Sequence, residues 1–260
     1  MPEADLALLL DAARAAAGIG LRHFGRAPEV WDKPGGHGPV TEADLEIDRM
    51  LRAELTAARP DYGWLSEETP DTPDRLEAER VFIVDPIDGT RAFIAGKKSW
   101  AHSLAVAERG RVIAGIVLLP AHDRTYAAAA GRGATRDGLP IAPTARDGLD
   151  GARVLANGGQ LSDAHWPGGA PSVERHFRPS LAYRMCLAAE GRYDAMLTFR
   201  DAWEWDVAAG DLIAREAGAA VTTREGAPAI YNNPGAQVAG MVVAGPALHA
   251  QIIARRGSAG

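Results

Sequence analysis

The stretch VDPIDGT, at residues 84–90, carries the strongest information about fold and chemistry in this chain of 260 residues. The apolar run at residues 81–84 leads into it, and its length and bounding turn residues predict a short buried strand. Two aspartates, Asp85 and Asp88, follow that run directly. We therefore expect two carboxylates to leave the same end of one buried strand.

Two carboxylates at one strand end cannot both stay ionised at close range unless a cation lies between them. Magnesium prefers oxygen ligands and is commonly held by a few carboxylates, waters and a phosphate group of the substrate. Gly89 lets the backbone approach a ligand, and Thr90 offers an N–H and a hydroxyl. A helix beginning here would add an anion site. The alternative is a type I turn, which also favours Asp, Pro and Gly. An EF-hand calcium loop is excluded, because this segment lacks the closing glutamate that such a loop needs.

Three further acidic positions are candidates, and each has a structural alternative. The Glu67–Glu68 pair lies between an aromatic-apolar stretch and a proline-rich loop, so it could be a solvated loop end. Asp206, in WDVAAG at residues 205–210, precedes a strongly apolar helical pattern and could be an N-cap. Asp44, in TEAD at residues 41–44, stands at the third position of a capping-box variant.

The rest of the chain predicts an α/β protein with an α+β first half. The expected helices are 4–24, one opened by Thr41, 180–190, 206–217 and 246–255. The expected strands are 81–84, 103–107, 112–118, 125–130, 153–156, 193–199, 219–223 and 240–244, with 131–152, 157–179 and 224–239 as loops. We expect a layered αβαβα sandwich, with an antiparallel-sheet subdomain at 1–144 and a smaller mixed-sheet α/β subdomain at 145–260 that contributes Asp206.

The composition and charge of the chain exclude several classes of function. Hydrophobic residues make up 47% and charged residues 24%, which is ordinary globular composition. The net charge of −6 argues against a nucleic-acid polymer as partner, and no segment predicts a signal peptide or a membrane span. Cys186 is the single cysteine, so no intrachain disulfide can form, which is typical of a reducing compartment. We expect a cytoplasmic protein that acts on a small phosphorylated substrate.

Taken together, the motifs resemble those of the inositol monophosphatase family of magnesium-dependent, lithium-sensitive phosphatases. The matching pieces are PVTEAD at 39–44, SEE at 66–68, DPIDGT at 85–90 and WDVAAG at 205–210. The resemblance runs from about Ala12 to Gly245, and the joint occurrence of the last two motifs is its most specific part. It implies a phosphoric monoester hydrolase, two to three Mg²⁺ per site, lithium sensitivity and a homodimer.

The resemblance also implies a role for each matching position. The catalytic residues would be Asp44, Glu67 and Thr90; the substrate-binding residues Gly89, Thr90 and Asp206; and the metal ligands Glu67, Asp85, Ile87 through its carbonyl, Asp88 and Asp206. Asp44 and Thr90 would form a hydrogen-bonded pair that orients the attacking water. The Gly89 and Thr90 backbone N–H groups would hold the phosphate. Glu68 is left out of the ligand set.

The substrate is the part that the resemblance leaves open. DGTRAFI at 88–94 and EWD at 204–206 are similar to the 3′(2′),5′-bisphosphate nucleotidase branch, although Arg91 could equally be a surface arginine. Inositol-1-monophosphatase and histidinol-phosphate phosphatase are the alternatives. The chain departs from the family at Pro179, where a glycine is common before the serine, and at the loop 157–160, which lacks a Ser-Arg pattern. A catalytically silent relative would need a lost ligand or threonine, and none is lost.

Overall fold

A computed structural model describes residues 1–33 and 38–257. The α-helices of this part are α1 (Pro2–His23), α2 (Glu42–Ala58), α3 (Thr90–Ile94), α4 (Leu181–Ala189), α5 (Glu204–Glu216) and α6 (Pro246–Gly257). The strands are β1 (Val30–Asp32), β2 (Pro39–Thr41), β3 (Gly63–Ser66), β4 (Arg80–Asp88), β5 (Ala101–Glu108), β6 (Arg111–Leu119), β7 (Arg124–Ala129), β8 (Ala134–Arg136), β9 (Leu139–Pro140), β10 (Arg153–Ala156), β11 (Glu174–His176), β12 (Ala195–Thr198), β13 (Ala202–Trp203), β14 (Ala220–Thr222), β15 (Gln237–Val238) and β16 (Met241–Ala244).

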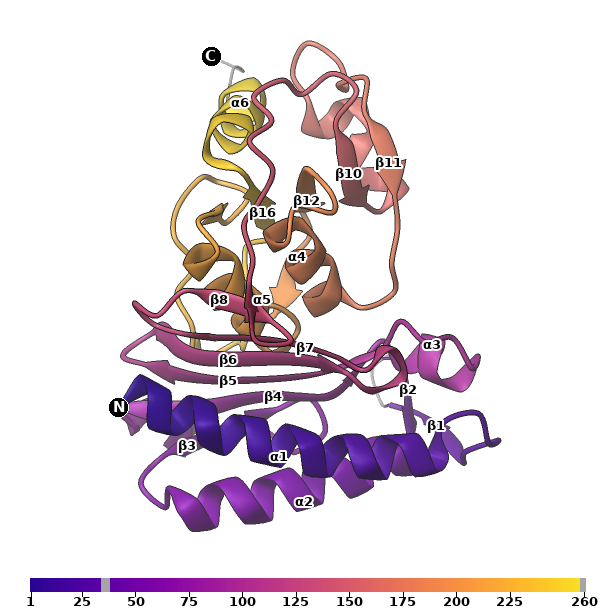
Figure 1. The fold of residues 1–260 in the computed structure, drawn as a ribbon, viewed down its shortest axis with the longest axis vertical. Coiled ribbons are helices and arrows are strands. Elements are labelled where there is room, and N and C mark those ends of the chain that lie inside the picture. Colours follow the sequence, from indigo (N-terminus) through magenta and orange to yellow (C-terminus); the bar gives the residue numbers. More distant parts are fainter. Residues whose placement is uncertain (34–37, 258–260) are drawn as a thin grey trace.

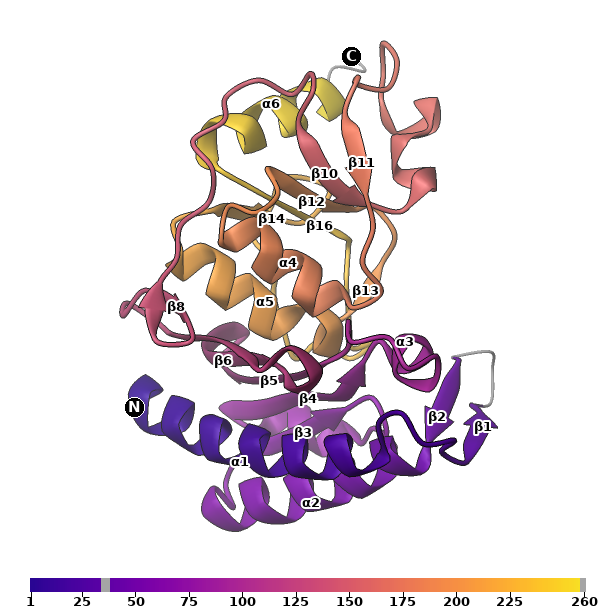
Figure 2. The same cartoon turned by 45° about the vertical axis from the view of Figure 1, so that its right-hand side comes forward.

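Five layers of alternating helices and sheets make up the molecule, as the αβαβα prediction required (Figure 1). A seven-stranded sheet, in the order β3-β4-β5-β6-β7-β8-β9, carries α1 and α2 on one face. Helices α4 and α5 cover its other face and separate it from a five-stranded sheet in the order β11-β10-β12-β16-β14 (Figure 2). Helix α6 closes the outer face of that second sheet.

The middle helical layer is explained by its composition. Every residue of α4 is buried, because the helix has a sheet on either side and no face toward water. Helix α5 approaches the first sheet closely at Gly115 of β6, where an added Cβ would lie 3.1 Å from the Cα of Ala209. A larger side chain at this strand position would therefore push the two layers apart.

The first sheet is not antiparallel throughout. Strand β3 runs parallel to β4, whereas the pairs from β4 to β9 are antiparallel. In the second sheet, β10 is parallel to both β11 and β12, and β16 is antiparallel to β12 and β14, so this sheet is mixed as expected. The parallel β3–β4 pair places the ends of both strands at the same edge of the first sheet.

The predicted elements with a clear apolar period are present, with ends that shift by a few residues. The segments predicted as loops contain short strands: β8 and β9 lie within 131–152, β11 within 157–179 and β15 within 224–239. These strands have two or three residues, too few for an alternating pattern to show in the sequence. The glycine- and proline-rich loop predicted at residues 33–39 falls partly outside the described residues.

Two observations bear on the chain as a whole. Within the described residues, no helix combines the length and the apolar character that crossing a membrane requires. Cys186 is a free, buried thiol in the middle of α4.

Candidate active site

The segment 84–90 forms the floor of the candidate site, and its structure corrects the simple turn interpretation. Strand β4 does not end at Val84 but continues to Asp88. Asp85 pairs with Ser103 of β5 and Asp88 pairs with Ala101, so β4 has one residue more than its partner between these positions. This is a β-bulge. Side chains three residues apart point to opposite faces of a regular strand, and the extra residue turns both carboxylates to one side.

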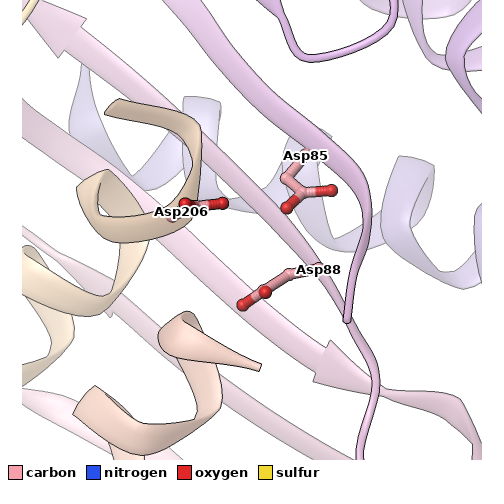
Figure 3. Close-up of side chains that lie close together, drawn as sticks. All are labelled: Asp85, Asp88 and Asp206. Atoms are coloured by element: carbon pink, nitrogen blue, oxygen red, sulfur yellow. The ribbon is translucent and has the colours of Figure 1, made fainter. Parts of the chain in front are cut away.

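Asp206 reaches the same point from the middle helical layer. Helix α5 begins at Glu204 with Trp203 as its N-cap, so Asp206 lies in the first helical turn and is not the N-cap. Ser103 of β5 donates its hydroxyl to the carbonyl oxygen of Trp205 at 2.9 Å, which ties the start of α5 to the strand beside Asp85. One carboxylate oxygen each from Asp85, Asp88 and Asp206 lies within 4.8 Å of the others (Figure 3).

This cluster has the properties of a cation site. Burial raises the pKa of Asp85 and of Asp206 well above the ordinary range, and neighbouring carboxylates raise both further. Asp85 Oδ1 is buried and has no hydrogen-bond partner among the described residues. Three carboxylates with an unsatisfied buried oxygen fit a hard divalent cation, which takes oxygen ligands and offsets the repulsion.

Asp88 has a second set of partners that the sequence did not indicate. Its Oδ2 accepts hydrogen bonds from Ser180 Oγ at 2.6 Å and from the Ala182 N–H at 2.7 Å, and its Oδ1 accepts one from the Leu181 N–H at 3.2 Å. Asp88 therefore caps the N-terminus of α4. Burial raises its pKa to about 6, and these hydrogen bonds and the charge of Arg184 limit the rise.

Arg184 is a cation beside the cluster and was also missed. The residue is only 6% exposed, and Asp88 and Asp206 both act on its charge. Burial lowers the pKa of Arg184 overall. An arginine inside an apolar helical pattern gives no sequence signal for this position, because its role arises only when α4 packs against the ends of β4 and α5.

Glu67 lies next to the cluster, although its carboxylate faces a lysine. It follows β3, and its N–H donates to the Val84 carbonyl oxygen at 3.2 Å, so the parallel β3–β4 pairing brings it beside Asp85. Lys33 Nζ lies 2.6 Å from Glu67 Oε1 and 2.6 Å from Glu68 Oε1. Burial, with the charge of Glu67, raises the pKa of Glu68 to about 8 despite that contact. Lys33 is thus a further site residue that sequence reasoning missed.

Asp44 and Thr90 face each other, as the resemblance implied. Thr90 Oγ1 lies 3.4 Å from Asp44 Oδ1 and 3.1 Å from the Ile87 carbonyl oxygen. Asp44 also completes the capping box with Thr41 at the start of α2, so the capping-box interpretation and the proximity to Thr90 are both correct. Burial raises the pKa of Asp44 to about 6, although its hydrogen bonds to Thr41 oppose the rise.

A cavity of about 370 Å³ opens over this arrangement. Its lining includes all three clustered aspartates, Glu67, Gly89 and Thr90. Arg91 and Lys97 also line it, as does Phe177, a residue that is 45% exposed. The cavity therefore combines a cation site with two positive side chains and one exposed aromatic ring.

We expect the stability of the metal-free protein to fall as the pH rises. A carboxyl group whose pKa is raised in the folded state binds more protons when folded than when unfolded, so its contribution decreases from its ordinary pKa up to its folded pKa. For Asp44 and Asp88 this window runs from 3.8 to about 6, and for Glu68 from 4.5 to about 8. Urea denaturation in the presence of a chelator should give a lower midpoint at pH 8 than at pH 5. A higher midpoint at pH 8 would contradict this electrostatic account.

Comparison with known proteins gives consistent matches. The model of the inositol monophosphatase family matches residues 2–259. An inositol-1-monophosphatase of Rhizobium meliloti is 35% identical over 197 residues, covering 72% of this chain and 73% of that protein. The 3′(2′),5′-bisphosphate nucleotidase CysQ of Escherichia coli is 30% identical over 212 residues, covering 78% of this chain and 85% of that protein. The solved structure of the Thermotoga maritima IMPase superposes with a TM-score of 0.81 at 28% identity, covering 98% of this chain and 96% of that chain.

Proposed function

Because this chain belongs to the inositol monophosphatase family and is a phosphoric monoester hydrolase, we propose that it is a magnesium-dependent 3′(2′),5′-bisphosphate nucleotidase. The observation that supports this choice is the shared cavity. There the three aspartates lie with Arg91, Lys97 and the exposed ring of Phe177. A bisphosphate nucleotide offers a second phosphate that can bind the Arg91 and Lys97 side chains. It also offers a planar base that can stack on the Phe177 ring.

In this proposal, the chain supplies the ligands for two to three magnesium ions. Glu67, Asp85, Asp88, Asp206 and the Ile87 carbonyl oxygen would hold them, and Glu67 would exchange its contact with Lys33 for a metal. Bound magnesium would neutralise the phosphate and lower the pKa of the attacking water. The unsatisfied oxygen of Asp85 and the all-oxygen donor set support this assignment.

The remaining catalytic work falls to protein groups around Thr90. The Gly89 and Thr90 N–H groups would hold the phosphate, and the Thr90 hydroxyl, set between Asp44 and the Ile87 carbonyl oxygen, would orient the attacking water. The water oxygen forms a bond to phosphorus while the bond from phosphorus to the ester oxygen breaks. The attacking water releases a proton to solvent and the leaving ester oxygen takes one up, so the products are an alcohol and inorganic phosphate. No protein nucleophile is needed, and the sequence contains no Asp-x-Asp-x-Thr motif of the phosphatases that use one.

A substrate panel tests the proposed function. Adenosine 3′,5′-bisphosphate, inositol 1-phosphate and histidinol phosphate should be compared with and without magnesium. We expect magnesium-dependent release of phosphate, with the highest kcat/KM for the bisphosphate. Higher kcat/KM for inositol 1-phosphate would replace the nucleotide assignment with the inositol-type alternative, which the similarity to the Rhizobium meliloti protein supports. The proposal also includes a homodimer in the cytoplasm, and light scattering after gel filtration would test the dimer.

Arg91→Gln should separate recognition of the second phosphate from chemistry. Arg91 is exposed at the cavity, so the substitution should leave the fold intact. Losing one charge-assisted contact should raise KM for adenosine 3′,5′-bisphosphate about tenfold. Turnover of a monophosphate such as inositol 1-phosphate should hardly change. Arg52→Gln, at another exposed position, is the matched control. An equal loss of activity with both substrates would show that Arg91 does not bind the second phosphate.

Lithium should inhibit the enzyme at concentrations at which sodium does not. The carboxylate oxygens proposed to hold magnesium would also accept lithium, which is small but brings one charge instead of two. Rates should be measured against substrate concentration in lithium and in sodium at equal ionic strength, so that screening is constant. We expect uncompetitive or mixed inhibition by millimolar lithium. Identical rates in the two salts would remove lithium sensitivity from the proposal and leave the metal ligands unaffected.

A further inference from the structure

A second cavity, of about 270 Å³, lies beside the catalytic cavity and shares no lining residue with it. We call it the arginine pocket. Its polar lining residues are Ser99, His122, Arg124, Arg178, Tyr183 and Arg192. They come from the loop before β5, the β6–β7 connection with the first residue of β7, the segment before α4, α4 itself and the segment after it. Five separate segments thus direct polar groups into one hollow.

The arginine pocket has a positive charge that its own lining does not offset. Among the described residues, no carboxylate lines it. Within the described residues, Arg124, Arg178 and Arg192 form no ion pair with a carboxylate within 4.0 Å. Glu190, the acid that acts on the charge of Arg124, is already bound to Arg136 at 2.6 Å. Three guanidinium groups therefore share a small volume, where the charge of Glu190 acts on Arg124 but none of the three has a direct carboxylate partner in the part of the chain that the structure describes.

Neutral partners fix two of these arginines in place. Arg124 Nη1 donates to the Tyr183 hydroxyl at 3.2 Å, and Arg178 Nη2 donates to the Tyr193 hydroxyl at 2.8 Å. Such contacts orient a guanidinium and leave its charge available to a ligand. Burial, followed by the charges of Arg124, Lys98 and Arg192, lowers the pKa of His122, as expected in a cationic environment.

We propose that the arginine pocket is a second ligand site, which binds a tetrahedral dianion such as a phosphate or sulfate group. Guanidinium groups recognise oxyanions through paired N–H donors, and three of them can contact a tetrahedral group on several sides. The volume suits an inorganic dianion or the phosphate end of a small metabolite. The site is separate from the acidic catalytic cluster, which repels anions when no metal is bound.

Isothermal titration calorimetry with the full chain in a chelator tests this site apart from catalysis. Sodium sulfate and sodium phosphate serve as probes, and acetate at the same ionic strength is the planar monoanion for comparison. We expect both dianions to bind and acetate to give no saturable heat. Arg192→Gln should weaken sulfate affinity about tenfold, and so should Arg124→Gln. Arg192→Lys should keep part of the affinity because it retains the charge.

Arg200→Gln, at an exposed arginine outside the pocket, is the matched control and should bind like the wild type. Arg192 is also exposed, so its variants should fold, and melting temperatures in chloride verify this. Absence of saturable binding by the wild type would overturn the proposal. So would binding that is unchanged in both glutamine variants, or equal binding of acetate. A shift in oligomeric state in Arg192→Gln without loss of sulfate affinity would assign these arginines to contact with a second copy instead.

Discussion

Asp85→Asn is expected to lower kcat by about 1,000-fold and, at the same time, to stabilise the metal-free protein. The loss of turnover follows because a metal site worth several kcal/mol of transition-state stabilisation loses one charged ligand. The gain in stability follows because the folded metal-free protein at pH 8 must either keep Asp85 ionised among other carboxylates or bind a proton there. Asparagine removes both costs while keeping the size of the side chain.

Two measurements on the same variant check this pair of effects. Steady-state turnover at saturating magnesium gives the loss of activity. Thermal unfolding at pH 8 in a chelator should show a melting temperature raised by roughly 2–4 °C, as expected for about 1 kcal/mol in a chain of this size. Asp61→Asn, at an exposed aspartate, should change neither quantity. Near-normal turnover of Asp85→Asn would exclude Asp85 as a ligand, and a lower melting temperature would contradict the repulsion within the cluster.

Thr90→Ala is expected to reduce kcat about 100-fold and to leave KM within a few-fold of the wild-type value. The hydroxyl lies between Asp44 and the Ile87 carbonyl oxygen, where it would position the attacking water. A positioning contact of this kind acts mainly in the transition state, and a small misplacement of a reacting group can cost two orders of magnitude.

Thr90→Ser provides the matched control, because it keeps the hydroxyl and removes only a methyl group. Serine should restore most of the lost turnover. A rise in KM with unchanged kcat in Thr90→Ala would mean that the hydroxyl binds the phosphate and does not orient water. Equal loss in the alanine and serine variants would point to packing of the methyl group, since Thr90 is 8% exposed.

The parts of the site that the sequence predicted are those encoded in short local patterns. Asp85 and Asp88 belong to a compact motif in which residue type and spacing already indicate metal chemistry. The role of Asp206 was implied by the family resemblance, and the structure brings the three together. The layered fold followed from the long apolar periods of its helices and strands. Lys33, Ser180 and Arg184 could not be predicted in the same way. Each acquires its role from a contact or a charge interaction with a residue tens of positions away.

The capping contacts of Asp88 with α4 could not be predicted from local sequence either. A serine before an apolar helix predicts an N-cap, and Ser180 does accept a hydrogen bond from the Tyr183 N–H. Nothing in either segment indicated that the helix would take a second capping group from β4. That contact exists because the two sheets share one helical layer, which is a property of the whole fold.

The bulge in β4 makes the site depend on the number of residues as well as on their identity. Between Asp85 and Asp88 the chain has one more residue than regular pairing with β5 would use. Deleting Ile87 would restore an unbroken ladder with both carboxylates still on one face, but it would remove the carbonyl oxygen that accepts the Thr90 hydroxyl at 3.1 Å. The resulting sheet would be more regular, but the Thr90 hydroxyl would lose one of the two acceptors that place it beside Asp44. In this segment, a gap in an alignment would therefore be more damaging than a conservative substitution.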